Sequence, residues 1–85
     1  MPLKAKVYVT PRKSVLDPQG KAVSGALHSL GYREVADVRI GRFMEVRLTE
    51  KDRAAAEQRL DEMCRRLLAN PTIEDYRFEI EEDRA

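Results

Sequence analysis

The chain begins with a run in which apolar and polar positions alternate. The apolar positions are Leu3, Ala5, Val7 and Val9, and polar or aromatic residues stand between them. A period of two with one apolar face is typical of a half-buried β-strand. Because Pro11 cannot donate a hydrogen bond to a sheet, we expect this strand to end there.

The spacing of apolar residues then changes to that of a helix. Asp17 can accept hydrogen bonds from the free amides of a first helical turn, and Pro18 suits the first helical position. One apolar stripe follows at helical spacing, made of Ala22, Val23, Ala26, Leu27 and Leu30. Gly31 can adopt the left-handed conformation that ends a helix. We therefore expect a helix over about residues 18–30.

Two short alternating runs come next and predict a pair of strands. The first contains Val38 and Ile40, and the second contains Met44, Val46 and Leu48. Between them lies Gly41-Arg42, and a glycine in the first position of a two-residue connection suits a type II′ hairpin turn.

A second helix is predicted after Thr49 or Asp52, either of which can cap it. Its apolar residues recur at spacings of three and four, and they are Ala56, Leu60, Met63, Cys64, Leu67 and Leu68. Asp61 and Arg65 stand four positions apart, acid before base, as do Glu62 and Arg66, an order that supports a helix. The helix should end at Asn70-Pro71, since the residue before a proline avoids helical geometry.

A final strand is predicted where Tyr76, Phe78 and Ile80 alternate with charged residues. The element order is then β-α-β-β-α-β in a single domain covering residues 1–85. For this order we expect an α+β fold of the ferredoxin-like kind, with an antiparallel sheet and both helices on one face. The other face of the sheet is polar, and copies of the chain could associate through it.

The composition narrows the possible functions. A domain of 85 residues has a marginal core, and small domains commonly gain stability from disulfides, metals or oligomerisation. One cysteine and one histidine exclude an internal disulfide and the usual Cys/His zinc clusters, so association with other chains is expected. Because 16 basic and 15 acidic residues nearly cancel, and no glycine-aromatic signature surrounds Tyr8 or Phe43, nucleic-acid binding is disfavoured.

The sequence contains no apolar run of the roughly 20 residues that a membrane span needs. A lone cysteine and the lack of an export signal favour a cytoplasmic location.

The residue types in the chain do not favour a catalytic site. Cys64 lies on the apolar stripe of the second helix, where burial would make its thiol inert. His28 shares the polar face of the first helix, so the two residues are not expected to form a nucleophile–base pair. The four glycines form no phosphate-binding motif, and Gly20 is better explained by close backbone packing than by anion binding at the helix start. A chain of this kind is expected to act by positioning other proteins.

Four motifs together resemble one family. They are LDPQG at residues 16–20, LGY at 30–32, VRIGR at 38–42 and LLANPTIEDY at 67–76. As a set they resemble the PurS family, the small subunits of formylglycinamide ribonucleotide amidotransferase, over nearly all 85 residues. One departure is visible, because Ser14 stands where the family often has a glycine.

The resemblance implies a non-catalytic role in purine biosynthesis. In this family the glutaminase PurQ releases ammonia, and the synthetase PurL uses ATP and Mg²⁺ to convert formylglycinamide ribonucleotide to its amidine. PurS would bridge PurQ and PurL, assist ammonia transfer, associate as a homodimer or higher oligomer, and bind no cofactor itself. A regulatory small-molecule-binding domain of the ACT kind is the alternative, since it shares the β-α-β-β-α-β order and fold alone does not fix function.

The residues that resemble family motifs also supply the candidate partner interface. The candidates are Asp17, Gln19, Gly20, Arg42, Asn70, Pro71 and Glu74. Each of these residues could serve the fold and not a partner protein, because Asp17 can cap a helix and Pro71 can end one. We do not expect a catalytic or metal-binding residue in the chain.

Overall fold

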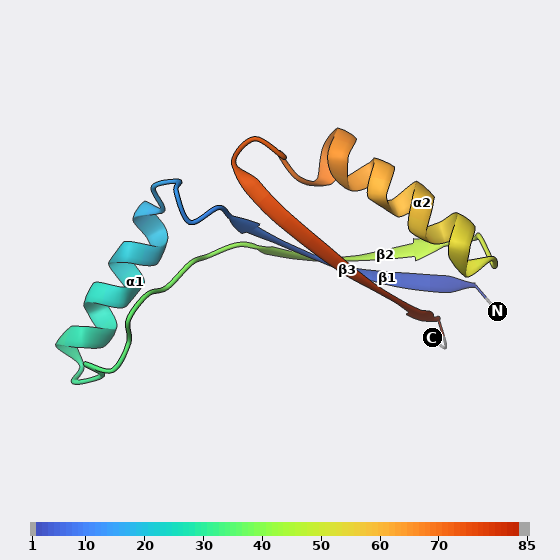
Figure 1. The fold of residues 1–85 in the computed structure, drawn as a ribbon. Helices are drawn as coiled ribbons and strands as arrows, with labels where there is room; N and C mark the ends of the chain where they lie inside the picture. Colours follow the sequence, from blue (N-terminus) through green and yellow to red (C-terminus); the bar gives the residue numbers. More distant parts are fainter. Residues whose placement is uncertain (1, 84–85) are drawn as a thin grey trace.

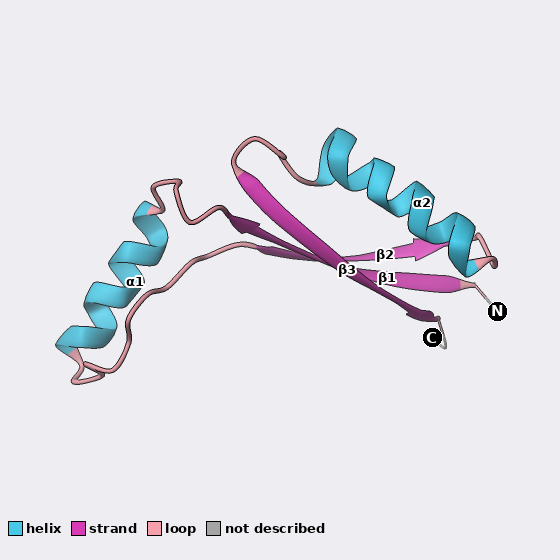
Figure 2. Ribbon diagram, viewed as in Figure 1, coloured by secondary structure: helices cyan, strands magenta, loops and turns pink. Residues whose placement is uncertain are grey.

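The computed structural model describes residues 2–83 as an α+β fold, shown in Figures 1 and 2. Its elements are β1 (Leu3–Pro11), α1 (Pro18–Ser29), β2 (Arg42–Leu48), α2 (Arg53–Met63), the π-helical turn η1 (Cys64–Leu68) and β3 (Glu74–Glu82). The α+β class, the antiparallel sheet and the presence of both helices are therefore confirmed.

The sheet is built around the first strand of the chain. Its order is β2-β1-β3, and both neighbours run antiparallel to β1. In this register Val7 lies opposite Met44 on one side and opposite Phe78 on the other. The apolar positions of all three strands therefore point to the same face, as their alternation in the sequence predicts.

The core lies between that face and α2, which crosses it in Figure 1. Its buried members from β1 and the second helical segment are Leu3, Ala5, Val7, Val9, Ala56, Leu60, Cys64 and Ala69. Half-buried side chains of β2 and β3 pack around them, including Met44, Val46, Tyr76, Phe78 and Ile80. The core positions expected on the first and last strands, on residues 44–48 and on the second helix are confirmed, with the exception of Leu67, which is 83% exposed.

The position of α1 differs from the prediction. In Figure 1 this helix lies beyond one end of the sheet, and α2 alone covers the apolar face. The Cα radius of gyration is 16.3 Å, against about 12 Å for a compact domain of this length. The expectation that both helices pack on one face is wrong, because the segments joining α1 to the sheet hold the helix away from it.

The predicted strand at 38–40 and the hairpin at Gly41-Arg42 are also wrong. Residues 34–41 have no regular secondary structure, and β2 pairs with β1 instead. The amide of Ile40 donates to the carboxylate of Asp17, the residue that caps α1, at 2.9 Å. This amide is therefore not available to pair with a neighbouring strand. Two alternating apolar residues, Val38 and Ile40, are too short a pattern to distinguish a strand from an irregular segment.

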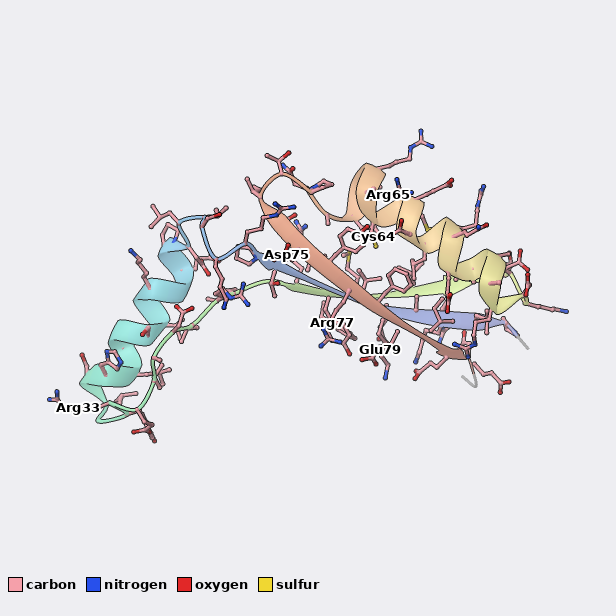
Figure 3. All side chains as sticks on the ribbon, in the orientation of Figure 1. Arg33, Cys64, Arg65, Asp75, Arg77 and Glu79 are labelled. Carbon is pink, nitrogen blue, oxygen red and sulfur yellow. The ribbon has the colours of Figure 1, made fainter. Side chains whose placement is uncertain are left out.

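The opposite face of the sheet carries charged and aromatic residues. Figure 3 shows Arg77 and Glu79 on the side of the sheet away from Cys64. The Arg77 guanidinium lies 3.9 Å from the centroid of the Tyr8 ring, and that ring lies 5.1 Å from the ring of Phe43. Lys4 forms ion pairs with Glu45 on one neighbouring strand and Glu81 on the other, at 3.3 and 3.5 Å.

Candidate partner-interface site

The candidate residues fall at the two ends of a narrow connection between α1 and the sheet. We call residues 11–17 and 38–41, the two segments that make this connection, the neck. Asp17, Gln19 and Gly20 lie where the neck meets α1. Arg42, Asn70, Pro71 and Glu74 lie where it meets the sheet. The structure therefore brings the seven residues together as two groups.

Asp17 organises the group at the start of α1. Its Oδ1 accepts a hydrogen bond from the amide of Gly20 at 3.0 Å, which confirms the predicted helix cap. Its Oδ2 accepts from the amide of Ile40 at 2.9 Å, a bond that spans 23 residues of sequence. The Gly20 amide, then the Ile40 amide, and also the nearby Arg39 guanidinium lower the pKa of Asp17 below its ordinary value. One carboxylate thus caps α1 and also bonds the first segment of the neck to the second.

Gly20 is buried because the returning segment passes directly over it. A Cβ atom at this position would overlap the carbonyl oxygen of Val38, which is a backbone atom. The interpretation of Gly20 as a close-packing glycine is therefore confirmed. Gln19 is exposed beside it, where its side chain faces solvent.

Two arginines that the sequence did not single out strengthen the neck. Arg39 donates from Nη1 to the carbonyl of Pro11 at 2.9 Å, which links the two neck segments. Arg12 donates from its side chain to the carbonyl of Pro71, and its amide donates to the carbonyl of Ile73 at 2.9 Å. Neither was proposed as a site residue, although Arg39 lies in the VRIGR motif, because each bonds to a backbone carbonyl that lies far away along the chain.

Arg42 and Glu74 organise the group at the sheet. Arg42 donates from Nη2 to the Glu74 carboxylate and to the carbonyl of Leu68, both at 3.0 Å. The same carboxylate oxygen accepts from the amide of Asn70 at 2.7 Å, and the Asn70 side chain accepts from the amide of Thr72 at 3.1 Å. Arg42, the first residue of β2, thus forms hydrogen bonds to both ends of the loop that connects η1 to β3.

Exposure in this second group leaves room for a partner. The Arg42 side chain is 57% exposed, whereas that of Glu74 is 20% exposed. An exposed guanidinium that is held in place by two acceptors retains N–H groups for further hydrogen bonds. This geometry is compatible with both roles considered for Arg42, because the same side chain supports the fold and presents a fixed positive charge.

An apolar groove lies nearby, next to the end of the second helix. The amide of Ala69 bonds to the carbonyl of Cys64 at 2.9 Å, five residues back, and this π-helical turn leaves Leu67 83% exposed. The groove has a volume of about 330 Å³ and is lined by Val46, Arg59, Glu62, Met63, Arg66, Leu67 and Leu68. No pattern in the sequence predicted the π-helical turn, which breaks the expected spacing of the helix.

The structure places the residues considered for chemistry apart from one another. Cys64 is fully buried in the core, and burial, followed by the charge of Asp61, raises the pKa of its thiol. His28 is exposed on α1, where its Nε2 lies 2.7 Å from the carbonyl oxygen of Val35. The prediction that Cys64 is a core residue is confirmed. Among residues 2–83, no three His, Cys, Asp or Glu side chains are grouped to hold a metal ion.

Acidification should open the neck at Asp17. Because the folded-state pKa of Asp17 is lowered, its contribution to stability is present above the unfolded-state pKa of about 3.9 and is lost as pH falls through the folded-state value. We expect the NMR amide signals of Gly20 and Ile40 to titrate together, with a midpoint below about 3.9. Asp17→Asn should abolish this shared transition, and independent midpoints for the two amides would contradict the shared carboxylate.

Comparison with known proteins connects this geometry to one family. The PurS family model, described as phosphoribosylformylglycinamidine (FGAM) synthase, matches residues 4–82. The chain is 57% identical over 79 residues to the PurS subunit of that synthase from Bacillus subtilis, covering 93% of each chain. It is 55% identical over 75 residues to the PurS subunit from a Synechocystis species, covering 88% of this chain and 75% of that protein.

Solved structures show the same fold. The structure of B. subtilis PurS matches with a TM-score of 0.80 and 56% identity, covering 94% of this chain and 99% of that one. A chain of a Thermotoga maritima complex described as PurLQS matches with a TM-score of 0.82 and 26% identity, covering 95% and 100%. Among the described residues, no helix is both long and apolar enough to cross a membrane.

Proposed function

This chain belongs to the PurS family of phosphoribosylformylglycinamidine synthase subunits, and from that premise we propose that it joins the synthetase PurL to the glutaminase PurQ. The observation that carries the proposal is the family match over residues 4–82, together with the likeness to a chain of the PurLQS complex. In this role the chain acts in the cytoplasm, where it also associates with further copies of itself.

The chemistry of the reaction explains why such a subunit is needed. Ammonia released into neutral water is mostly protonated and is then no longer a nucleophile. A glutaminase and a synthetase must therefore be held together, with water kept out of the route between their active sites. A small protein meets that need by fixing the relative position of the two enzymes. The catalytic groups, ATP and Mg²⁺ then belong to the partners.

We assign the partner contacts to the two residue groups at the ends of the neck. Arg42 offers an exposed, fixed charge, and Asn70 and Pro71 lie beside it on the η1–β3 loop. Asp17, Gln19 and Gly20 form the other group, where the exposed side chain of Gln19 is available to a partner. Rigid positioning by backbone hydrogen bonds favours recognition, because little side-chain entropy is lost on binding.

Removal of this chain should abolish the coupling between the two enzymes. PurL and PurQ from the same source would be assayed for amidine formation with glutamine as the nitrogen donor, with and without the chain. We expect the glutamine-dependent rate to need the chain, whereas the rate with added ammonium salt should not. The ammonium reaction is the control, since it bypasses ammonia transfer. Full glutamine-dependent activity without the chain would contradict the proposal.

The same assay tests the interface with a matched pair of variants. Arg42→Glu reverses a charge in the sheet-end group, and Arg65→Glu reverses one on the outer face of the second helix, where Arg65 pairs with Asp61 at 3.0 Å. Both residues are similarly exposed, at 57% and 58%. We expect only Arg42→Glu to weaken assembly with PurL and PurQ. A thermal melt that shows large destabilisation by Arg42→Glu would mean that the loss of assembly follows from the loss of the fold and not from a lost partner contact.

A further inference from the structure

In the single chain, α1 meets the rest of the fold mainly at the neck. The structure describes every residue of α1, and only Gly20 among them is buried. This glycine lies where the neck meets the helix, next to the carbonyl oxygen of Val38. The rest of α1 extends beyond the end of the sheet in Figure 1. The angle between the helix and the sheet is therefore set largely by the neck.

Two hydrogen bonds cross the neck from one segment to the other. The Oδ2 of Asp17 accepts from the amide of Ile40, and Arg39 donates to the carbonyl of Pro11, both at 2.9 Å. Pro11 and Asp17 are the two ends of the first segment, whereas Arg39 and Ile40 are adjacent in the second. Two neighbouring residues thus hold both ends of one loop.

Backbone packing limits bending of the second segment. At its helix end, the carbonyl oxygen of Val38 occupies the place of a Cβ on Gly20, and at its sheet end, the carbonyl oxygen of Val9 occupies the place of a Cβ on Gly41. A hinge needs residues that are free to change their backbone angles. Both ends of this segment are instead packed backbone against backbone, so the neck is a stiff connection.

The bonding continues from the neck into the second group of candidate contacts. The amide of Arg12 donates to the carbonyl of Ile73 at 2.9 Å, and its side chain donates to the carbonyl of Pro71. The Arg12 Nε also lies 3.5 Å from a carboxylate oxygen of Asp75 at the start of β3. The two contact groups are therefore linked by a series of hydrogen bonds to backbone atoms.

We propose that the neck is a rigid spacer between the two partner-contact groups, and that Arg39 and Asp17 are positioning residues for ammonia transfer. The inference rests on the proposed bridging function, in which these groups hold the two enzymes. Because ammonia must pass between two active sites, an error in their relative position lowers transfer even when both enzymes stay bound. Hydrogen bonds from charged side chains suit this task, since they are stronger than neutral ones.

A distance measurement tests the spacer without the enzymes. Spin labels attached after Ser29→Cys at the end of α1 and Gln58→Cys on α2 report the separation of the helix from the sheet. An excess of unlabelled chain keeps labelled chains apart, and Cys64 is buried from the reagent. We expect one narrow distance distribution, which broadens when Asp17→Asn or Arg39→Met is added. Equal widths in all three proteins would overturn the proposal.

The variants are chosen to remove single bonds. Asparagine caps a helix as well as aspartate does, and its oxygen can still accept from the amide of Gly20. Its NH₂ group cannot accept from the amide of Ile40, so Asp17→Asn removes only the bond across the neck. Arg39→Met removes the bond to Pro11, whereas Arg39→Lys keeps a donor and should restore the narrow distribution.

The amidine assay separates a positioning role of Arg39 from a contact role. The chain would be titrated into PurL and PurQ with glutamine as the nitrogen donor. A lost contact raises the concentration of chain that is needed, and the rate recovers at saturation. A lost position does not recover, so at saturation we expect Arg39→Met to stay about 10-fold below the wild-type rate and Arg39→Lys to approach it. Full recovery with Arg39→Met would overturn the positioning role.

Arg33→Met is the matched control for the loss of an arginine. Arg33 is exposed at the end of α1 away from the neck, as Figure 3 shows, so its loss should change neither the distances nor the rate. Circular dichroism reports whether each variant is folded, and Arg39→Ala replaces Arg39→Met if that variant is not. The label distances test the neck, and the need for the chain in the glutamine reaction tests the bridging function. Either can therefore fail while the other stands.

Discussion

Replacing Leu60 by alanine should lower the free energy of unfolding by about 2–5 kcal/mol, as expected for a large-to-small change in a core. Leu60 is fully buried and is the largest member of the cluster that joins α2 to β1. Because a small domain is stabilised by only about 5–15 kcal/mol, this loss removes a large part of the total. Urea denaturation followed by circular dichroism would measure the change.

Leu16→Ala is the matched control for this substitution. The same atoms are removed, but Leu16 is 68% exposed, so its loss should change the free energy of unfolding by less than about 0.5 kcal/mol. Both variants should be measured at several protein concentrations, since self-association adds to apparent stability. Equal effects of the two substitutions would mean that Leu60 does not anchor the core.

A methyl group at Gly41 should destabilise the fold by about 3 kcal/mol, at the upper end of the usual cost of overpacking. A Cβ at Gly41 would overlap the carbonyl oxygen of Val9 and lie 3.0 Å from the Cα of Thr10. These are backbone atoms of the central strand, which cannot rotate away as a side chain can. Thermal unfolding of Gly41→Ala would measure the loss, and we also expect the neighbouring Arg42 to move away from Glu74.

Gly25→Ala provides a control of opposite sign. Gly25 lies inside α1, and a Cβ added there would have no neighbour within 4 Å. Alanine in a helix interior is favoured over glycine by about 0.5–1 kcal/mol, so this variant should be slightly more stable than the wild type. If Gly25→Ala lowered the free energy of unfolding and Gly41→Ala left it unchanged, the packing described for the two glycines would be wrong.

The regular elements could be predicted because each carries a complete local pattern. Four alternating apolar residues specify β1, and the Asp17-Pro18 start with Gly31 at the end specifies α1. In β1 the burial pattern repeats the alternation of its sequence, and in α1 the observed bounds and cap match the start and stop signals. The prediction therefore needed no knowledge of what the element contacts.

The arrangement of these elements could not be predicted in the same way. The stripe of α1 indicates that the helix packs against an apolar surface, but a pattern does not specify whether that surface belongs to the same chain. Likewise, Val38 and Ile40 alternate as in a strand, while the bond from the Ile40 amide goes to the Asp17 side chain. The error at 38–41 therefore arose from a tertiary contact with no signal in the local sequence.

The candidate site was predicted through motifs and not through geometry. Resemblance selected Arg42 and Glu74, but only the structure shows that they bond to each other across 32 positions. Capping chemistry explained one oxygen of Asp17, whereas the second oxygen and its long-range partner were missed. Arg12 and Arg39 were missed because an arginine that binds backbone carbonyls resembles any other surface arginine in sequence.

The central position of β1 in the sheet has a consequence for the order of folding. Leu3 pairs with Leu48 on one side and with Glu82 on the other, so β1 can be paired on both sides only after β3 has been synthesised. One edge of β1 must stay unpaired until then, and Lys4 and Lys6 help to keep that edge from aggregating. Closing the sheet depends on contacts between two strands that lie far apart in the sequence, and such pairing forms slowly.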